Sequence, residues 1–341
     1  MTSLRLMAAA ALLLISLTAA AQPDPIRVVA TTTQASDITR ILTDGLDTFD
    51  ITSLMGAGVD PHLYKPTESD IRAMNAARMV VYSGLHLEGQ FDAVFEALSE
   101  QGVLIYAMGK PVKDAGYIVG WMDPAQATAG TDDPHFWFDP RNWEITVLDL
   151  AEALGELSPE SADVISANAE AYVEKLQVLF TWADEAMRTV PKGQRYLVTS
   201  HDAFQYFGAA FGWQMMSVQG ISTVDEAGVG DIQSTVQFIL DNEIPVLFVE
   251  SSIPPNTVQA VREAVLAGGG SVRIGVRELY SDAMGDPTTF GGTYVGMIAS
   301  NVLTIVQSYQ CAGVDEAAAP EWPESLDLEL PEELTDVDCS A

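Results

Sequence analysis

Residues 158–190 read SPESADVISANAEAYVEKLQVLFTWADEAMRTV and form the most periodic segment of the chain. Apolar side chains recur in it at steps of three and four residues, as they do on one face of a helix: Ile165, Ala169, Tyr172, Leu176, Leu179, Ala183, Met187 and Val190. Pro159 suits the first helical turn and Pro191 stops the far end. Such a helix would be about 45 Å long, which suits a strut that spans two lobes. Two shorter helices with a kink near Asn168 are the alternative.

On both sides of this segment the chain alternates short apolar runs with helical patterns, which predicts an α/β fold with mainly parallel sheets. Strands are expected at residues 27–31, 49–54, 79–83, 103–106, 196–199, 215–218, 246–249 and 272–274. Helices are expected at residues 35–43, 69–77, 232–242, 256–267 and 293–309. Thr67 is the expected N-cap of the second helix, with Asp70 in its first turn. We therefore predict an N-terminal α/β lobe (22–157), a linking helix (158–190) and a C-terminal α/β lobe (191–312).

The first residues have the pattern of a cleaved secretory signal. Arg5 gives a small positive region, residues 6–17 are apolar, and Ala19, Ala20 and Ala21 supply small residues for cleavage. The apolar run is too short to span a bilayer as a helix, although an uncleaved membrane anchor is the alternative. We expect residues 1–21 to be a signal peptide and the mature chain to be exported to the periplasm. Because no cysteine stands at the cleavage point, a lipid anchor is not expected.

The last residues, 313–341, form an acidic, proline-containing tail without a basic residue, which we interpret as extended or disordered. The chain has two cysteines, Cys311 and Cys339, which flank this tail. In an oxidising compartment they can form one disulfide that holds the tail to the body. A thiolate metal pair is the alternative, but the spacing of the two cysteines differs from Cys-x-x-Cys.

Composition narrows the classes of partner. The chain has 341 residues, with 48 acidic and 16 basic side chains, a formal net charge of −32 and 48% hydrophobic residues. A chain of this length usually needs more than one hydrophobic core, which again favours two lobes. Nucleic acid and anionic lipid are poor partners because the basic residues that neutralise phosphate are missing. The acidity itself is typical of a solvated surface suited to a saline habitat, with attraction of metal cations as the alternative.

Histidine is rare, and three of the four histidines lie in conspicuous loops. His62 and His135 each follow Asp-Pro, and proline makes the loop before each imidazole stiff and non-helical. His201 follows the predicted strand at 196–199, where open α/β sheets bind their ligands. A loop at 279–285, shortly after the last predicted strand, adds a carboxylate. Three imidazoles and one carboxylate would suit a divalent transition metal; His86, in an ordinary setting, is left outside the group.

The sequence around these residues resembles the TroA/ZnuA-like solute-binding proteins, the zinc- and manganese-binding components of bacterial ABC importers. Four separated motifs carry the resemblance, in the expected order: residues 60–70 (DPHLYKPTESD), 133–140 (DPHFWFDP), 199–204 (TSHDAF) and 279–285 (LYSDAMG). Shorter similarities at 83–88, 249–252 and 293–297 extend it over nearly the whole mature chain, to about residue 309. The acidic tail lies outside it.

The resemblance implies two α/β lobes joined by one long helix, with the metal in the cleft between them. The ligand motifs of the family fall on His62 and His135 in the first lobe and on His201 and Asp282 in the second. Many manganese-preferring members have Glu at the position of His201, whereas zinc binders often carry a His-rich loop where residues 120–133 contain no histidine. The implied cargo is therefore Zn²⁺ or Mn²⁺, with Fe²⁺ also possible, delivered by a monomer to the ABC permease in the inner membrane.

Several residues near the motifs have two interpretations. Asp139 could orient a ligand imidazole or cap the helix that begins near Asn142. Glu250 could line the cleft or complete a turn, and Trp121 and Trp137 are expected to pack. A zinc-dependent hydrolase is disfavoured, because Ser200, His201 and Asp202 are adjacent in sequence and four protein ligands leave no position for water. A surface adhesin of the same fold is the other alternative. Because imidazole binds metal only when neutral, affinity should fall below about pH 6.5.

Overall fold

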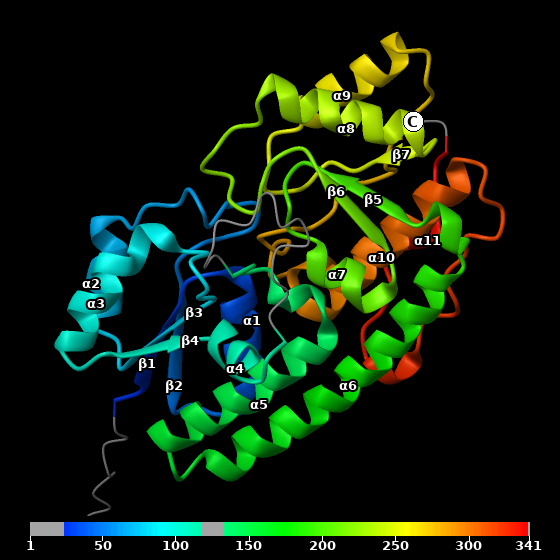
Figure 1. Ribbon diagram of the computed structural model, residues 1–341. Helices are drawn as coiled ribbons and strands as arrows, with labels where there is room; N and C mark the ends of the chain where they lie inside the picture. Colours follow the sequence, from blue (N-terminus) through cyan, green and yellow to red (C-terminus); the bar gives the residue numbers. More distant parts are fainter. Residues whose placement is uncertain (1–23, 118–131, 340–341) are drawn as a thin grey trace, which may run out of the picture.

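The computed structural model describes residues 24–117 and 132–339 (Figure 1). The predicted signal peptide, Trp121 and most of the loop at 120–133 lie outside these residues. Two groups of parallel strands, each covered by helices on both faces, lie on one side of a long helix (Figure 1). Within the described residues, no helix combines the length and the hydrophobicity needed to cross a membrane.

The N-terminal half, residues 24–157, contains a four-stranded parallel sheet with the order β2-β1-β3-β4. Its strands are β1 (Ile26–Ala30), β2 (Phe49–Ser53), β3 (Met79–Tyr82) and β4 (Leu104–Ala107). Its helices are α1 (Thr33–Leu42), α2 (Glu68–Asn75), α3 (Asp92–Glu100), α4 (Gly109–Asp114) and α5 (Pro140–Leu157). The predicted strands are confirmed to within one residue at each end. Apolar side chains cover both faces of the central strands, as buried parallel sheets require.

Helix boundaries in this half follow local capping chemistry. The Thr67 hydroxyl accepts a hydrogen bond from the Asp70 N–H, and the Asp70 carboxylate accepts one from the Thr67 N–H, so the predicted cap of α2 is confirmed as a capping box. α5 begins at Pro140, and the Asp139 carboxylate accepts from the Arg141 N–H and pairs with its guanidinium. Asp139 therefore caps α5, and the alternative that it orients a ligand imidazole is wrong.

The predicted strut is one unbroken helix, α6 (Ala162–Arg188), of 27 residues. The alternative of two helices with a kink near Asn168 is therefore wrong, and the amide of that side chain donates to the carbonyls of Leu42 and Asp44. The helix starts three residues after Pro159, which lies in a turn, so the expected place of this proline in the first helical turn is wrong. α6 packs along α5 and also against α1, α7 and α10, and so contacts both halves.

The C-terminal half, residues 191–311, also alternates parallel strands with helices. Its strands are β5 (Tyr196–Thr199), β6 (Gln214–Ser217), β7 (Val246–Leu247) and β8 (Arg273–Ile274). Its helices are α7 (Gln205–Phe211), α8 (Val229–Asp241), α9 (Asn256–Ala267) and α10 (Tyr294–Cys311). β5 pairs with β6 and β7 with β8, all parallel, and the Phe248 N–H donates to the Val198 carbonyl, which brings the two pairs edge to edge. β7 is two residues shorter than predicted.

The side chains of the two halves form one shared core and two peripheral cores. The shared core includes the stacked pairs Phe138–Phe204 and Trp143–Tyr294, each of which joins the two halves. The N-terminal peripheral core lies between the sheet and α2–α3: Val29, Met74, Ala77, Val80, Phe91, Phe95, Leu98 and Val103. The C-terminal peripheral core lies under α8–α9: Val198, Val218, Ile239, Ile244, Leu247, Val249, Val258, Val261, Val265 and Val272. The halves are thus fused at their base.

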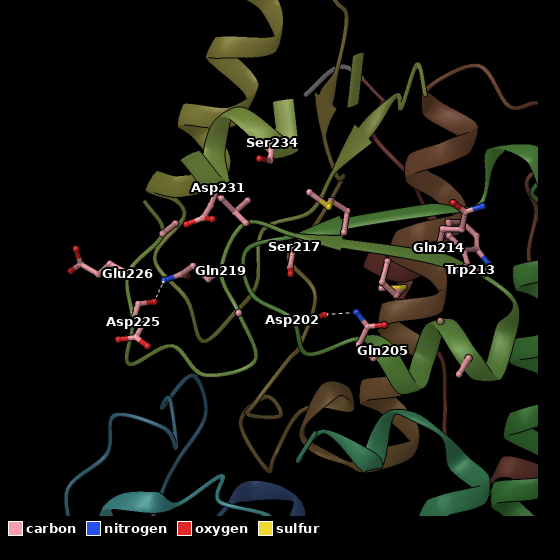
Figure 2. A pocket seen from close by; sticks show the side chains of 17 residues that line it. Asp202, Gln205, Trp213, Gln214, Ser217, Gln219, Asp225, Glu226, Asp231 and Ser234 are labelled. Carbon is pink, nitrogen blue, oxygen red and sulfur yellow. Dashed lines mark hydrogen bonds between the residues drawn. The ribbon is translucent and has the colours of Figure 1, made fainter. Parts of the chain in front are cut away.

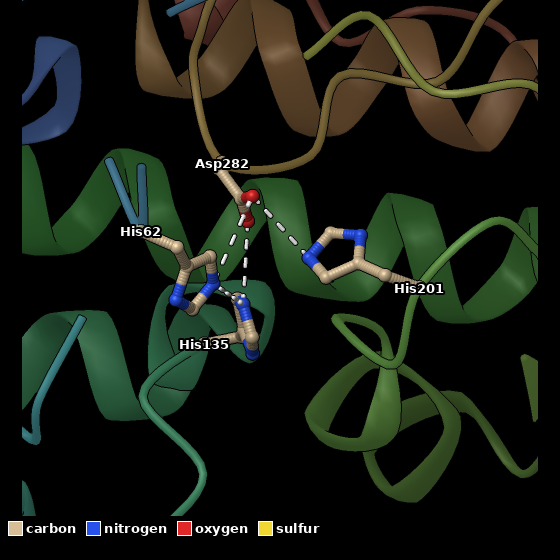
Figure 3. Close-up of side chains that lie close together, drawn as sticks. All are labelled: His62, His135, His201 and Asp282. Atoms are coloured by element: carbon tan, nitrogen blue, oxygen red, sulfur yellow. Dashed lines mark hydrogen bonds and ion pairs between the residues drawn. The ribbon is translucent and has the colours of Figure 1, made fainter. Parts of the chain in front are cut away.

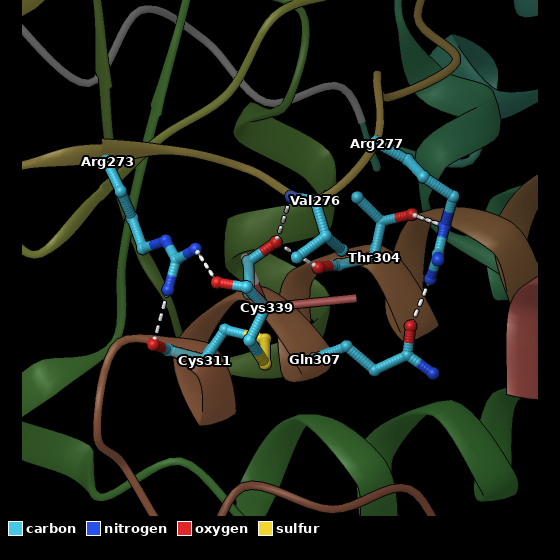
Figure 4. Close-up of a disulfide and its surroundings, with 8 residues drawn as sticks. Arg273, Val276, Arg277, Thr304, Gln307, Cys311 and Cys339 are labelled. Carbon is cyan, nitrogen blue, oxygen red and sulfur yellow. Dashed lines mark hydrogen bonds between the residues drawn. A yellow bond between two sulfur atoms is a disulfide. The ribbon is translucent and has the colours of Figure 1, made fainter. Parts of the chain in front are cut away.

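The tail after Gly313 is packed, so the expectation that it might be disordered is wrong, although its path is largely irregular. Leu326 and Leu334 are buried, the latter in the short helix α11 (Glu332–Thr335), and the Trp182 indole donates to the Pro320 carbonyl. The predicted disulfide Cys311–Cys339 is present (Figure 4). Arg273 donates to the carbonyls of both cysteines, which fixes the far end of the tail beside β8.

Candidate metal centre

The four predicted ligands come together between the two halves (Figure 3). One ligand atom from each of His62, His135, His201 and Asp282 can be chosen so that all four lie within 4.8 Å of one another. They arrive from four separate segments: two loops of the N-terminal half, the end of β5, and the loop between β8 and α10. All four residues are buried. Sequence placed these residues in loops, and the tertiary fold directs the loops to one point.

The ring of His135 is held by the aspartate two residues before it. Asp133 Oδ1 lies 2.8 Å from Nδ1 of His135 and also accepts a hydrogen bond from its backbone N–H. The other ring nitrogen, Nε2, lies 3.2 Å from Asp282 Oδ1. The Asp-Pro-His sequence therefore supplies both a ligand and its orienting carboxylate, because a hydrogen bond at Nδ1 leaves Nε2 free to bind metal.

The ring of His201 is held by a carboxylate from another strand. Glu250 Oε2 lies 2.5 Å from Nδ1 of His201, and its Oε1 accepts from the His201 backbone N–H. Nε2 of the same ring lies 3.2 Å from Asp282 Oδ2. Glu250 is buried at the end of the segment that follows β7, next to β5. Of its two interpretations, the one that places it at the cleft is confirmed, with orientation of His201 as the geometric reason.

His62 is held differently. Its backbone N–H donates to Asp60 Oδ1 over 2.8 Å, while the polar contacts of its ring are with His135 and Asp282 of the centre. Nε2 lies 3.4 Å from His135 Nε2 and 3.9 Å from Asp282 Oδ2. Among the described residues, no carboxylate outside the centre orients this imidazole. His62 is also the most exposed of the four ligands, at 5% against 0–1% for the others.

Asp282 is fixed through its backbone by the N-terminal half. The Gln34 side chain donates to the Asp282 carbonyl, and the Met284 N–H donates to the Thr33 hydroxyl, both at the start of α1. The two carboxylate oxygens of Asp282 and Nε2 of His201 are buried and face other members of the centre, and among the described residues they have no hydrogen-bond partner outside it. Buried polar atoms that converge in this way need a partner, and a divalent cation bound by N and O ligands fits that need.

Charge in the centre is strongly coupled. Burial disfavours a charged His135, but its hydrogen bonds to the carboxylates of Asp133 and Asp282 raise its pKa to about 9. Burial opposes charge on His201 too, yet Asp282 and Glu250 hold its pKa well above the ordinary value. Burial, together with the neighbouring His135 and His201, lowers the pKa of His62 to about 3, against the attraction of Asp282. Burial would raise the pKa of Asp282, but the two imidazoles hold it well below its usual range. Protons and a metal ion therefore compete for the same atoms.

Sequence reasoning missed one residue of the centre and left another open. Asp133 was quoted only as part of a motif, although its carboxylate at two residues before a ligand was a usable signal. Glu250 could not be assigned, because its contact with His201 spans 49 residues. His86 lies apart on the surface beside Asp92, in agreement with its exclusion from the group. Trp137 is fully buried and its carbonyl accepts from Tyr294, as expected for a packing residue.

A groove of about 720 Å³ lies apart from the four ligands, along β6 (Figure 2). It is bounded by α7, by β6 and by the segment that leads into α8. Its lining includes Asp202, Asp225, Glu226 and Asp231, and none of the four predicted ligands. The metal centre is closed by contrast, so a small ion, and not a larger organic ligand, is the kind of occupant that fits it.

Known proteins share this architecture. The zinc-binding protein TroA of Treponema pallidum is 38% identical over 288 residues, which cover 84% of this chain and 90% of TroA. The manganese-binding lipoprotein MntA of Bacillus subtilis is 38% identical over 283 residues, which cover 83% of this chain and 89% of MntA. A solved structure of TroA superposes with a TM-score of 0.76 and 36% identity, and the match covers 83% of this chain and 99% of that one.

Fold and relatives together define a metal-binding solute-binding protein of the ABC-importer class. The chain belongs to the family described as zinc-uptake complex component A, periplasmic, whose model matches residues 28–308. Solute-binding proteins of this class work outside the cytoplasm with membrane permeases. MntA is named a lipoprotein, and the absence of a lipid anchor from this chain stays an untested expectation. The tail and its disulfide lie beyond the matched residues.

Proposed function

We propose that this protein captures one divalent transition metal, zinc or manganese, in the periplasm and delivers it to the permease of an ABC importer in the inner membrane. The ligands are His62, His135, His201 and Asp282. The observation that carries the proposal is the convergence of three imidazole nitrogens and one carboxylate, all buried, from four segments of the chain. Two of the three imidazoles are oriented by carboxylates, the arrangement that metal-ligating histidines commonly use.

The ligand set suits a borderline cation and leaves the choice among metals to geometry and supply. Imidazole favours zinc and carboxylate also accepts manganese, while iron(II) accepts both. TroA is a zinc-binding protein and MntA a manganese-binding one, and this chain is 38% identical to each. We therefore propose zinc or manganese as the transported ion and include iron(II) in the test.

The proposed action is capture and not catalysis. Four protein ligands complete a tetrahedral zinc ion, so none of its coordination positions remains for the water that a hydrolase must activate. We propose that the protein works as a monomer, with a division into an N-terminal lobe, a linking helix, a C-terminal lobe and a tail at the boundaries predicted from the sequence. The shared core fuses the halves at their base. This supports small movements on metal binding and not a wide hinge motion.

The test is metal content and competition affinity on metal-stripped protein, with zinc, manganese and iron(II) offered in parallel. We expect one tight equivalent of zinc or manganese, lost in His201→Ala because both the ligand and the partner of Glu250 are removed. His86→Ala is the matched control, since this histidine is exposed and remote from the centre, and it should bind like the wild type. Wild-type protein that binds none of the three metals stoichiometrically would overturn the proposal.

A further inference from the structure

The loop that carries His62 meets a loop of the C-terminal half beside the metal centre, and we call this contact the mouth of the centre. The loop that carries His62 runs between Leu54 and Tyr64, and both of these side chains pack against the N-terminal peripheral core. A second loop runs between Val218 and Ala227, which pack in or against the C-terminal peripheral core. Each loop is therefore anchored in its own peripheral core. Contact between the two loops therefore indicates that the mouth is closed.

One hydrogen bond joins the two loops. The Thr223 hydroxyl donates to Asp60 Oδ2 over 2.6 Å, across 163 residues of sequence. Thr223 is 8% exposed and Asp60 is partly exposed, so this contact is partly shielded from water. A hydrogen bond to a charged group is stronger than one between neutral groups, and partial burial strengthens it further.

Asp60 uses its other oxygen on the metal ligand itself. Oδ1 accepts from the backbone N–H of His62 over 2.8 Å, while Oδ2 accepts from Thr223. The same carboxylate thus fixes the backbone of His62 and holds the opposite loop. If the hydrogen bond from Thr223 breaks, the Asp60 side chain loses one of the two partners that hold it. The backbone of His62, which donates to the same carboxylate, is then held less firmly.

His62 is the ligand whose release matters most for the exit of the metal. It is the most exposed of the four, and its ring lacks the orienting carboxylate that the other two histidines have. Asp282 is tied to α1 through Gln34 and Thr33, and the Tyr294 N–H at the start of α10 donates to Asp37 of α1. These links join the two halves at α1, separately from the contact between Thr223 and Asp60.

We propose that Asp60 and Thr223 form a latch across the mouth of the metal centre that positions His62 and sets the rate at which bound metal leaves. The two residues are positioning residues, because they act through His62 and do not touch the ion. The inference rests on the proposed metal capture. It adds that the two halves separate first at the contact between Asp60 and Thr223. It predicts slower release with the latch closed and faster release with the latch broken.

The test is the rate of metal dissociation from the full chain, measured by rapid mixing of the zinc- or manganese-loaded protein with excess chelator. Thr223→Val keeps the size of the side chain but removes the donor, and it should raise the dissociation rate about 10-fold, the effect expected for one hydrogen bond to a charged group. Thr223→Ser restores the hydroxyl and should stay within about twofold of the wild type. Thr223→Ala is a second variant without the donor and should behave like Thr223→Val.

The matched control is Thr335→Val, which removes another exposed threonine hydrogen bond, from the Thr335 hydroxyl to the Glu332 carbonyl in α11 of the tail. It should leave the dissociation rate unchanged. Thermal unfolding of the metal-free variants separates the latch from a merely structural contact, which would lower the melting temperature without changing the rate. A dissociation rate of Thr223→Val equal to that of the wild type would overturn the latch alone, whereas a wild type that binds no metal would overturn the proposed function as well.

Discussion

The metal centre and the C-terminal tail both bring distant segments together, but by opposite means. In the centre, four polar side chains from four segments face one another, and several of their atoms have no other partner. In the tail, one covalent bond, Cys311–Cys339, joins the ends of the segment, and apolar side chains such as Leu326 and Leu334 fill the space between. The centre lies within the residues matched by the family, and the tail lies beyond them.

The two regions are expected to respond differently to metal and to pH. A cluster of buried charges and imidazoles is complete only with a cation, so its stability depends on metal and on protons. The tail, closed by its disulfide and packed on the body, needs no further partner, and its stability depends on neither metal nor protons. The centre is therefore expected to open and close in use, while the tail keeps the C-terminal end of the chain fixed beside α6 and α10. Three experiments test this difference between the metal centre and the tail.

The largest expected effect is on the tail. Replacing both cysteines, as Cys311→Ser with Cys339→Ser, should lower the free energy of unfolding by about 3–4 kcal/mol, because a closed loop of 28 residues no longer restricts the unfolded chain. Chemical denaturation of the metal-free protein measures this loss. Metal affinity should stay within about twofold of the wild type. A large fall in affinity would show that the tail and the centre are coupled, and the contrast would fail.

The next effect is on the centre alone. Glu250→Gln keeps the size of the side chain but removes the charge that orients His201, and it should weaken metal affinity about 10- to 100-fold. Competition with a metal-binding dye measures the change. Glu263→Gln, at an exposed position of α9, is the matched control and should bind like the wild type. Equal affinities in both variants would mean that Glu250 serves only the fold.

The last experiment concerns the pH dependence of metal binding. In the metal-free protein the pKa of His135 is raised to about 9 and that of His201 is raised as well, so both imidazoles hold protons near neutral pH. Metal must displace these protons, and apparent affinity should therefore fall as pH falls below about 9, by about tenfold per pH unit for each proton released. Competition titrations between pH 6 and 9 measure the slope. An affinity that stays constant down to about pH 6.5 would match isolated imidazoles and contradict the coupling.

Much of the fold could be predicted from local pattern. The apolar periodicity of residues 158–190 predicted α6, and the capping residues Thr67 and Asp70 predicted the start of α2. The path of the tail could not be predicted, because its composition is that of a disordered segment. It is ordered only because Cys339 is bonded to Cys311 and because its few apolar side chains find places on the body.

The centre divides in the same way. His62, His135, His201 and Asp282 were named from motifs, and the structure brings them together, although metal binding itself awaits the test. The orienting role of Glu250 was open, since its partner is 49 residues away. The competing roles of Asp139 were also open until the start of α5 showed it to be a cap.

The sequence by itself determined which side chains carry the chemistry and which segments are helices and strands, because residue type and hydrophobic period act over a few residues. Only the tertiary structure decided how far apart those side chains lie, which carboxylate holds which imidazole, and that the pKa of His135 lies near 9 and not near the ordinary value of 6.5. It also placed Thr223 against Asp60. These properties depend on distances and burial between segments far apart in the sequence, such as the 163 residues between Asp60 and Thr223, and no local pattern records them.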